Sequence, residues 1–268
     1  MNRQVSIKSF FAVILVCYGT ALSFDLTLFP QQEELLSLRN IKYTNMLHTG
    51  AENDTFYMRG RFGVDFPLLG MNLDHIKSWD IGVTASAHIN MIPENMKFAV
   101  DNFYAILTVY LTSQISEQFS FKLYPVYHLS AHLADGHKGG IDEEDVRAVS
   151  SEMVRAELYY RFWDFFEISP AYGWYYNVGT QKELKQRLDL SLLVKSEITA
   201  GIEPLVYLKG ELVHLGYWRG GFDGSAGILF SRGTRGFGLL FRYFNRPHTS
   251  YYYQEYERGW GVEYWILN

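Results

Sequence analysis

One segment of the chain carries side chains that could perform acyl-transfer chemistry. Within residues 119–133, His128, Ser130 and His132 occupy every second position. A serine hydroxyl beside an imidazole base can become an activated nucleophile, and an acid near the base assists it. Residues two apart on a strand have Cα atoms about 6 to 7 Å apart, which permits a hydrogen bond between their side chains. His128, Ser130 and His132 are therefore the candidate catalytic residues.

Two other roles are open to the same side chains. They could fill the lumen of a small barrel as a hydrogen-bonded plug, because such barrels fill their interior with side chains. They could also hold a small molecule or an ion. His128 and His132 alone would lie about 13 Å apart in an extended strand, too far to share one metal ion. We predict neither a metal site nor a cofactor.

The segment that contains these residues has the two-residue period of a β-strand. Its odd positions, from Phe119 to Leu133, are almost all apolar, and its even positions include all three candidate residues. Successive side chains on a strand point to opposite faces, so the three polar side chains would share one face. In a barrel with an apolar exterior, this alternation predicts that they point into the lumen.

About twelve segments of the chain alternate in this way. Aromatic residues make up 17% of the sequence, yet no run after residue 23 approaches the ~20 apolar residues of a membrane-spanning helix. A transmembrane barrel reconciles these facts, because its lipid-facing side chains occupy every second position. We predict an all-β fold, a transmembrane antiparallel up-and-down barrel of about twelve strands, with ten as the fallback and a soluble β-sandwich as the alternative. The predicted strands are 41–47, 57–65, 79–91, 102–114, 119–131, 153–163, 165–176, 186–196, 203–213, 223–231, 236–244 and 257–267.

The first 23 residues resemble a secretory signal peptide. Arg3 and Lys8 precede an apolar run, and small residues at Ala21 and Ser23 suit a cleavage site. We expect residues 24–40 to form a short periplasmic leading segment and residues 41–268 to form the barrel. The expected location is the bacterial outer membrane, with its lipid and the barrel-assembly machinery as partners.

Cleavage there would leave a chain without cysteine, because Cys17 is the only one in the sequence. Disulfides, thiol catalysis and thiolate metal sites are then excluded. The loss of two cations, Arg3 and Lys8, changes the formal charge from −5 to −7. The sequence has no basic stripe and no nucleic-acid motif, so we expect no nucleic-acid partner.

The links between the predicted strands alternate between short and long, as expected for tight periplasmic turns and longer extracellular loops. One link, 66–78, is too long for the periplasmic turn it should be. Either it packs as a plug or the strands beside it extend further than predicted. The links predicted to be long are 48–56, 92–101, 132–152, 177–185, 214–222 and 245–256.

This topology brings further polar residues to the outer end of the lumen. The predicted strand 79–91 ends there, and the predicted strand 102–114 begins there. The long link 132–152 and the predicted strand 236–244 reach the same level. We expect a polar lumen cluster beside the candidate catalytic residues, which could take a small molecule or an ion. Its predicted members are His88, Asn90, Asp101, Asn102, Asp135 and Arg242.

Residues 128–135, H-L-S-A-H-L-A-D, resemble the H-x-S-S-H-L-G-D signature of a bacterial family called domain of unknown function 1207. Residues 101–104 are similar to its central element, and residues 247–251 with 259–262 to its C-terminal pattern. Ala131 and Ala134 depart from the signature. The resemblance implies an envelope or outer-membrane location and supplies no activity.

His128 and Ser130 also resemble the H-x-S pair of outer-membrane phospholipases, which are twelve-stranded barrels of similar length. The N-G-R that follows the pair in that family is absent here. In that family the pair faces lipid, whereas the alternation here predicts a pair inside the lumen. The sequence therefore favours a non-enzymatic barrel, either a narrow pore or a structural barrel with a polar, filled lumen. The alternative is a hydrolase, at the lumen or the rim, that uses Ser130 with His128 or His132.

Overall fold

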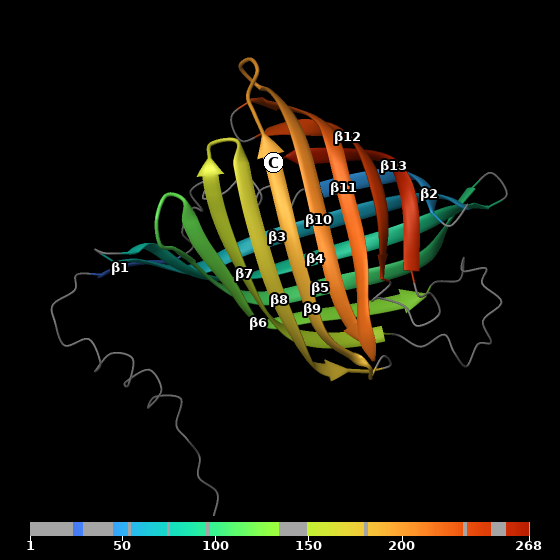
Figure 1. Ribbon diagram of the computed structural model, residues 1–268, viewed down its shortest axis with the longest axis horizontal. Coiled ribbons are helices and arrows are strands. Elements are labelled where there is room, and N and C mark those ends of the chain that lie inside the picture. The colour runs from blue at the N-terminus through green and yellow to red at the C-terminus, as the bar shows by residue number, and fades with distance from the viewer. Residues whose placement is uncertain are drawn as a thin grey trace, which may run out of the picture.

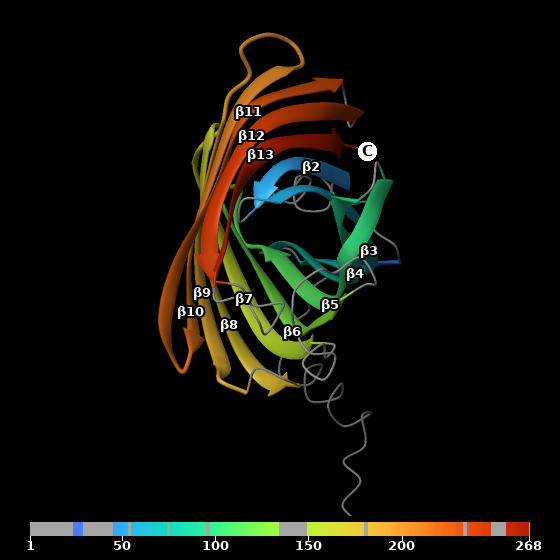
Figure 2. The ribbon, with the colours of Figure 1, turned by 90° about the vertical axis from the view of Figure 1, so that its right-hand side faces the viewer.

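The computed structural model describes residues 24–28, 45–52, 55–73, 76–94, 97–133, 149–179, 182–232, 235–247 and 256–267. Within these ranges, twelve antiparallel strands form a closed ring in which each strand pairs with its neighbours in sequence and β13 pairs with β2. The strands curve around a central space (Figure 1, Figure 2). The ring consists of β2 (Asn45–Glu52), β3 (Thr55–Leu73), β4 (Ile76–Glu94), β5 (Lys97–Gln114), β6 (Phe119–Leu133), β7 (Val149–Trp163), β8 (Phe166–Val178), β9 (Leu184–Lys195), β10 (Ile202–Leu215), β11 (Tyr217–Arg232), β12 (Arg235–Pro247) and β13 (Tyr256–Leu267).

The predicted antiparallel up-and-down barrel is confirmed, and the described residues supply the twelve strands predicted for it. A further short strand, β1 (Phe24–Leu28), pairs with the end of β3, where Phe24 lies opposite Leu73. The remainder of the predicted leading segment, and the predicted signal peptide, lie outside the described residues.

The alternation that predicts the strands is visible in the burial of their side chains. Large apolar side chains such as Phe66, Leu190 and Phe241 are exposed on the outer wall, whereas polar ones such as Thr108 and Asp189 are buried inside. This is the reverse of a water-soluble domain and is typical of a wall that faces lipid. The closed ring also excludes the β-sandwich alternative. Among the described residues, no helix is long and apolar enough to cross a membrane.

Several strands are longer than their alternation predicts. The link 66–78 is neither a plug nor a long turn, because β3 continues to Leu73 and β4 begins at Ile76. Four links predicted to be long are shorter, because the flanking strands extend into them. β10 and β11, for example, are separated by Gly216 alone, which has a φ of 77° that glycine adopts without strain. Residues 134–148 and 248–255 of the other two long links lie outside the described residues.

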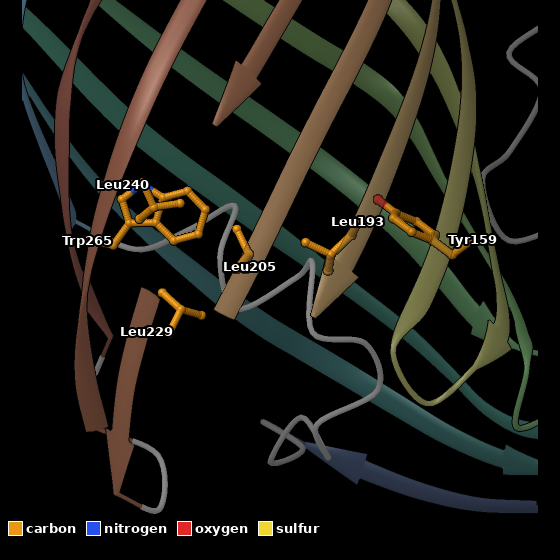
Figure 3. Close-up of a cluster of buried hydrophobic side chains, with 6 residues drawn as sticks. All are labelled: Tyr159, Leu193, Leu205, Leu229, Leu240 and Trp265. Carbon is orange, nitrogen blue, oxygen red and sulfur yellow. The ribbon is translucent and has the colours of Figure 1, made fainter. Parts of the chain in front are cut away.

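Two apolar clusters occupy parts of the barrel interior. The first lies toward the end of the barrel where β9 ends and β10 begins, and Figure 3 shows its six side chains. The second lies near the opposite end of strands β7 to β10. Polar side chains fill much of the space between them. The first cluster comprises Tyr159, Leu193, Leu205, Leu229, Leu240 and Trp265, and the second Met153, Tyr175, Leu184, Val213 and Leu215.

Candidate functional site

A β-bulge in β6 decides whether the candidate catalytic residues face the lumen or the outside of the barrel. In the first half of the strand, Ser120, Lys122 and Tyr124 are buried inside the barrel, as the alternation predicts. The register against β7 then shifts between Tyr124 and Tyr127, so that β6 holds one residue more than its partner. The register against β5 shifts in the same stretch. One extra residue reverses the inward and outward positions of everything that follows.

Beyond the bulge, Tyr127 and Leu129 line the central cavity of the barrel. Ala131 is fully buried, and His132 is exposed. His128, Ser130 and His132 therefore point outward from the barrel wall. The predicted position of these three side chains in the lumen is wrong, because strict alternation does not allow for the extra residue.

The outward-facing residues contact one another and the next two strands. Ser130 Oγ lies 2.9 Å from His132 Nε2 within β6. His128 Nδ1 lies 3.4 Å from Glu152 Oε1 on β7. On β8, Asn177 Nδ2 donates a hydrogen bond of 3.2 Å to Glu152 Oε2. We call His128, Ser130, His132, Glu152 and Asn177 the outer-wall cluster.

A second bulge places Asn177 in this cluster. Glu152 pairs with Asn177 and Met153 with Tyr175, so that Tyr176 is the extra residue of β8. Glu152 thus gathers groups from three strands on the same face of the wall. Neither Glu152 nor Asn177 was predicted from the sequence, because their proximity depends on the register between strands.

The surroundings of the outer-wall cluster are aromatic and apolar. Trp174 and Tyr176 are exposed on β8, and Leu107 of β5 lies exposed directly opposite His128. Exposed Trp and Tyr side chains are typical of the girdle at which a barrel meets the membrane interface. Charged side chains on a lipid-facing wall are costly near the bilayer centre and much less so near this interface. The cluster is therefore a polar site on a wall where large apolar side chains predominate.

The structure brings four residues of the predicted lumen cluster together. A chain of hydrogen bonds runs from Arg59 through Asn90 and Asn102 to Asp101, and each of its three donor–acceptor distances is 2.6 Å. His88 lies on the same strand as Asn90, and its ring stacks on that of Tyr104, with 4.2 Å between the ring centroids. Both His88 and Asn90 line the central cavity.

Of the other two predicted members, Arg242 is outside this chain of hydrogen bonds but lines the same cavity. Arg242 is inside the barrel on β12, where its guanidinium donates hydrogen bonds of 2.8 Å to Asp223 and to Glu263. Asp135 lies outside the described residues. The bulge of β6 separates the described members of the predicted lumen cluster from the candidate catalytic residues, which point outward from the wall.

A dense set of ion pairs inside the barrel was not predicted. Asp189 of β9 accepts contacts from Arg155 Nη1 at 2.6 Å, from Arg187 Nε at 2.9 Å and from Lys209 Nζ at 3.6 Å. Arg155 Nε also lies 2.7 Å from a carboxylate oxygen of Glu157. A signal for this layer exists in the sequence, because opposite charges alternate two residues apart at 155/157, 187/189 and 209/211. We call Arg155, Glu157, Arg187, Asp189, Lys209 and Glu211 the lumen ion-pair layer.

A cavity of 310 Å³ lies inside the barrel between this layer and the strands β3, β4, β12 and β13. Tyr159 and Trp265, which belong to the first apolar cluster (Figure 3), line part of it. Among the described residues, no group of three or more His, Cys, Asp or Glu side chains is arranged to hold a metal ion.

No protein-family model and no curated protein sequence matches this chain. Solved structures do match it. Outer membrane phospholipase A from Escherichia coli aligns with a TM-score of 0.53 at 11% identity, over 84% of this chain and 90% of that one. The NanC porin aligns with a TM-score of 0.46 at 9% identity, over 84% and 100% of the two chains. The β-domain of the Bordetella autotransporter BrkA gives 0.43 at 12%, over 84% and 97%. In its fold, the chain is similar to outer-membrane β-barrels.

Proposed function

We propose that this barrel resides in the bacterial outer membrane and carries a serine hydrolase site on its membrane-facing wall. The observation that carries the proposal is the outer-wall cluster, in which Ser130 lies 2.9 Å from His132 and His128 lies 3.4 Å from Glu152. A nucleophile beside one candidate base, and a second candidate base beside a carboxylate, thus share the outer face of the wall, where a bilayer would be the neighbour. The substrate class is an acyl ester of membrane lipid.

In this mechanism Ser130 Oγ attacks the ester carbonyl carbon and gives its proton to an imidazole. The collapsing tetrahedral intermediate expels the lipid alcohol, which takes that proton from the imidazolium. Water then attacks the acyl-serine, releases the fatty acid and restores Ser130. His132 is the base in the geometry described above. His128 is the alternative base, because the Glu152 carboxylate can orient its ring and stabilise its charged form.

The fold agrees with this proposal, since outer membrane phospholipase A is a similar barrel. The outward direction of His128 and Ser130 also removes the objection that a lumen-facing pair would not reach lipid. We include in the proposal that the chain is a divergent member of the domain of unknown function 1207 family, in which case the signature at residues 128–135 contributes to an outer-wall site.

For the interior we propose a structural role instead of a pore. The lumen ion-pair layer and the apolar clusters support this, because buried and mutually paired charges occupy space that an ion would have to cross. The barrel would then serve as a rigid scaffold for the outer-wall cluster, since sites on strands are held more precisely than sites on loops.

The test is hydrolysis of phosphatidylethanolamine by the detergent-folded mature chain, followed as release of free fatty acid. Ser130→Ala should lower the rate at least about a thousandfold, because the nucleophile of a triad is not replaced by its neighbours. Ser150→Ala is the matched control: Ser150 lies directly opposite Ser130 on β7, and its loss should change the rate less than twofold. Equal rates for the wild type and Ser130→Ala would contradict the proposal.

The two histidines can be separated in the same assay. If His132 is the base, His132→Ala should reduce the rate as strongly as Ser130→Ala, and His128→Ala should reduce it less. The opposite order assigns the base to His128, with Glu152 as its orienting acid. If neither His132→Ala nor His128→Ala lowered the hydrolysis rate, the mechanism would be contradicted.

A further inference from the structure

The turn between β7 and β8 exposes large aromatic side chains at the end of the barrel opposite to the outer-wall cluster. β7 ends at Trp163 and β8 begins at Phe166, so that Asp164 and Phe165 alone connect them. Trp163 is 61% exposed and Phe165 is 48% exposed, and their rings stack with 5.4 Å between the centroids. Turns that meet water are usually built from small and polar residues, and contiguous exposed apolar surface marks a contact with a partner or a membrane.

The turns on either side of this one also expose apolar side chains. Ile115, in the link between β5 and β6, is 45% exposed, and Ile198, in the link between β9 and β10, is 70% exposed. At the opposite end of the barrel, the link between β8 and β9 exposes Lys182 and Glu183 instead. We call Ile115, Trp163, Phe165 and Ile198 the apolar turn edge.

The apolar turn edge continues the lipid-facing wall. Tyr160 and Phe162 are exposed on the outer face of β7, and their rings pack edge to face with 4.6 Å between the centroids. The ring of Phe162 in turn lies 6.1 Å from that of Trp163. Exposed aromatic surface therefore runs from the wall onto the rim of the barrel.

Backbone groups of these turns are hydrogen-bonded within the protein. The carbonyl of Phe165 accepts the N–H of Lys195 at 2.8 Å, and Ile198 donates its N–H to the carbonyl of Ile202 at 3.0 Å. Unpaired backbone groups are the main obstacle to placing a turn against lipid, and here that obstacle is reduced. The single charge at the tip, the carboxylate of Asp164, costs little at the level of the membrane interface.

We propose that the apolar turn edge is a membrane anchor, embedded in the interface of the leaflet opposite to the outer-wall cluster and covered by lipid. The strand lengths support this placement. β8 and β9 have 13 and 12 residues, and a strand tilted by about 45° needs about 9 to 11 residues to cross the apolar core of a bilayer. Their ends therefore lie close to the membrane boundary. The anchor fixes the depth of the barrel in the membrane, and with it the depth of the outer-wall cluster.

This inference rests on the membrane location proposed above and is independent of the hydrolase activity. The experiment uses the folded mature chain in phosphatidylcholine vesicles, with an NBD fluorophore on a single introduced cysteine. The fluorophore is placed at Asp164→Cys in the edge, at Lys182→Cys in the turn at the opposite end, or at Leu190→Cys on the outer wall, where Leu190 is 45% exposed. The quenchers are a nitroxide on the lipid acyl chain near the head group, and iodide on both sides of the membrane.

At Asp164→Cys the lipid nitroxide should quench the fluorophore, and iodide should quench it at least about fivefold less than at Lys182→Cys. Replacing both rings, Trp163→Ser with Phe165→Ser, should raise iodide quenching at Asp164→Cys toward the value at Lys182→Cys. The matched control replaces two exposed rings at the opposite end, Tyr217→Ser with Trp218→Ser, and should leave the quenching at Asp164→Cys unchanged.

Free access of iodide to the fluorophore at Asp164→Cys would overturn the proposal. Protection from both quenchers would overturn it as well, because a protein surface, such as a second copy of the chain, would then cover the edge. The fluorophore at Leu190→Cys separates this failure from a failure of the proposed location. Quenching by the lipid nitroxide at Leu190→Cys alone would leave the barrel in the membrane without the anchor, whereas its absence at both positions would overturn the membrane location too.

Discussion

Asp189 is the residue on which the lumen ion-pair layer depends most, and replacing it by Asn should destabilise the barrel strongly. Its carboxylate is about 1% exposed and contacts Arg155, Arg187 and Lys209. Asn has nearly the same volume, so the change removes charge without creating a cavity. Three buried cations then face two carboxylates, those of Glu157 and Glu211. Removal of one partner from a buried ion pair costs about 3 to 5 kcal/mol.

Urea unfolding of the barrel in lipid vesicles, followed by tryptophan fluorescence, measures this cost. With a denaturant dependence of about 3 kcal/mol per molar, the midpoint should fall by about 1 M or more. Glu152→Gln is the comparison: its ion pair with His128 is about one-third exposed, and such pairs contribute about 0 to 1 kcal/mol. A loss of unfolding free energy below about 1 kcal/mol for Asp189→Asn would refute the view that this carboxylate compensates the buried cations of the layer. Adding Lys209→Met should recover part of the loss, because it removes the excess cation.

Three further predictions concern the wall, the close approach of two strands and the lumen. Because the chain after residue 23 lacks cysteine, a nitroxide can be attached at a single introduced cysteine. In vesicles, a nitroxide at Ser130→Cys should be more accessible to oxygen than to a water-soluble nickel chelate, as expected for a lipid-facing position. A nitroxide at Leu129→Cys should not show this preference for oxygen. Gly227→Ala should lower the melting temperature, because a Cβ there would lie 2.1 Å from the backbone oxygen of Leu239, and Gly210→Ala, with nothing within 4 Å, should be tolerated. In planar bilayers the folded barrel should give no stepwise currents of porin size, and steady steps would contradict a filled lumen.

The fold was predictable because one physical rule extends over the whole chain. A wall between lipid and a polar interior requires apolar side chains at every second position, and Phe237, Leu239 and Phe241 show the pattern as clearly as residues 119–123 do. The ends of the strands were less predictable. Where β3, β4 and β5 extend beyond their predicted bounds, their alternation weakens while the backbone pairing continues.

The site was only half predictable. The sequence identifies His128, Ser130 and His132, but a single extra residue at the bulge turns their side chains from the lumen to the outside of the barrel. Residues from Pro125 to Tyr127 are all apolar or aromatic, so the polarity of the side chains does not reveal where the reversal occurs. Glu152 was missed for a different reason, since its contact with His128 depends on the register of two strands joined by a long link.

The most direct test of the central claim is covalent labelling of the detergent-folded mature chain with a fluorophosphonate, which reacts with activated serines. Digestion and mass spectrometry should place the adduct on Ser130, and Ser130→Ala should remain unlabelled while Ser150→Ala is labelled as fast as the wild type. Absence of an adduct on a correctly folded barrel, or an adduct on another serine that persists in Ser130→Ala, would contradict a hydrolase site on the outer wall.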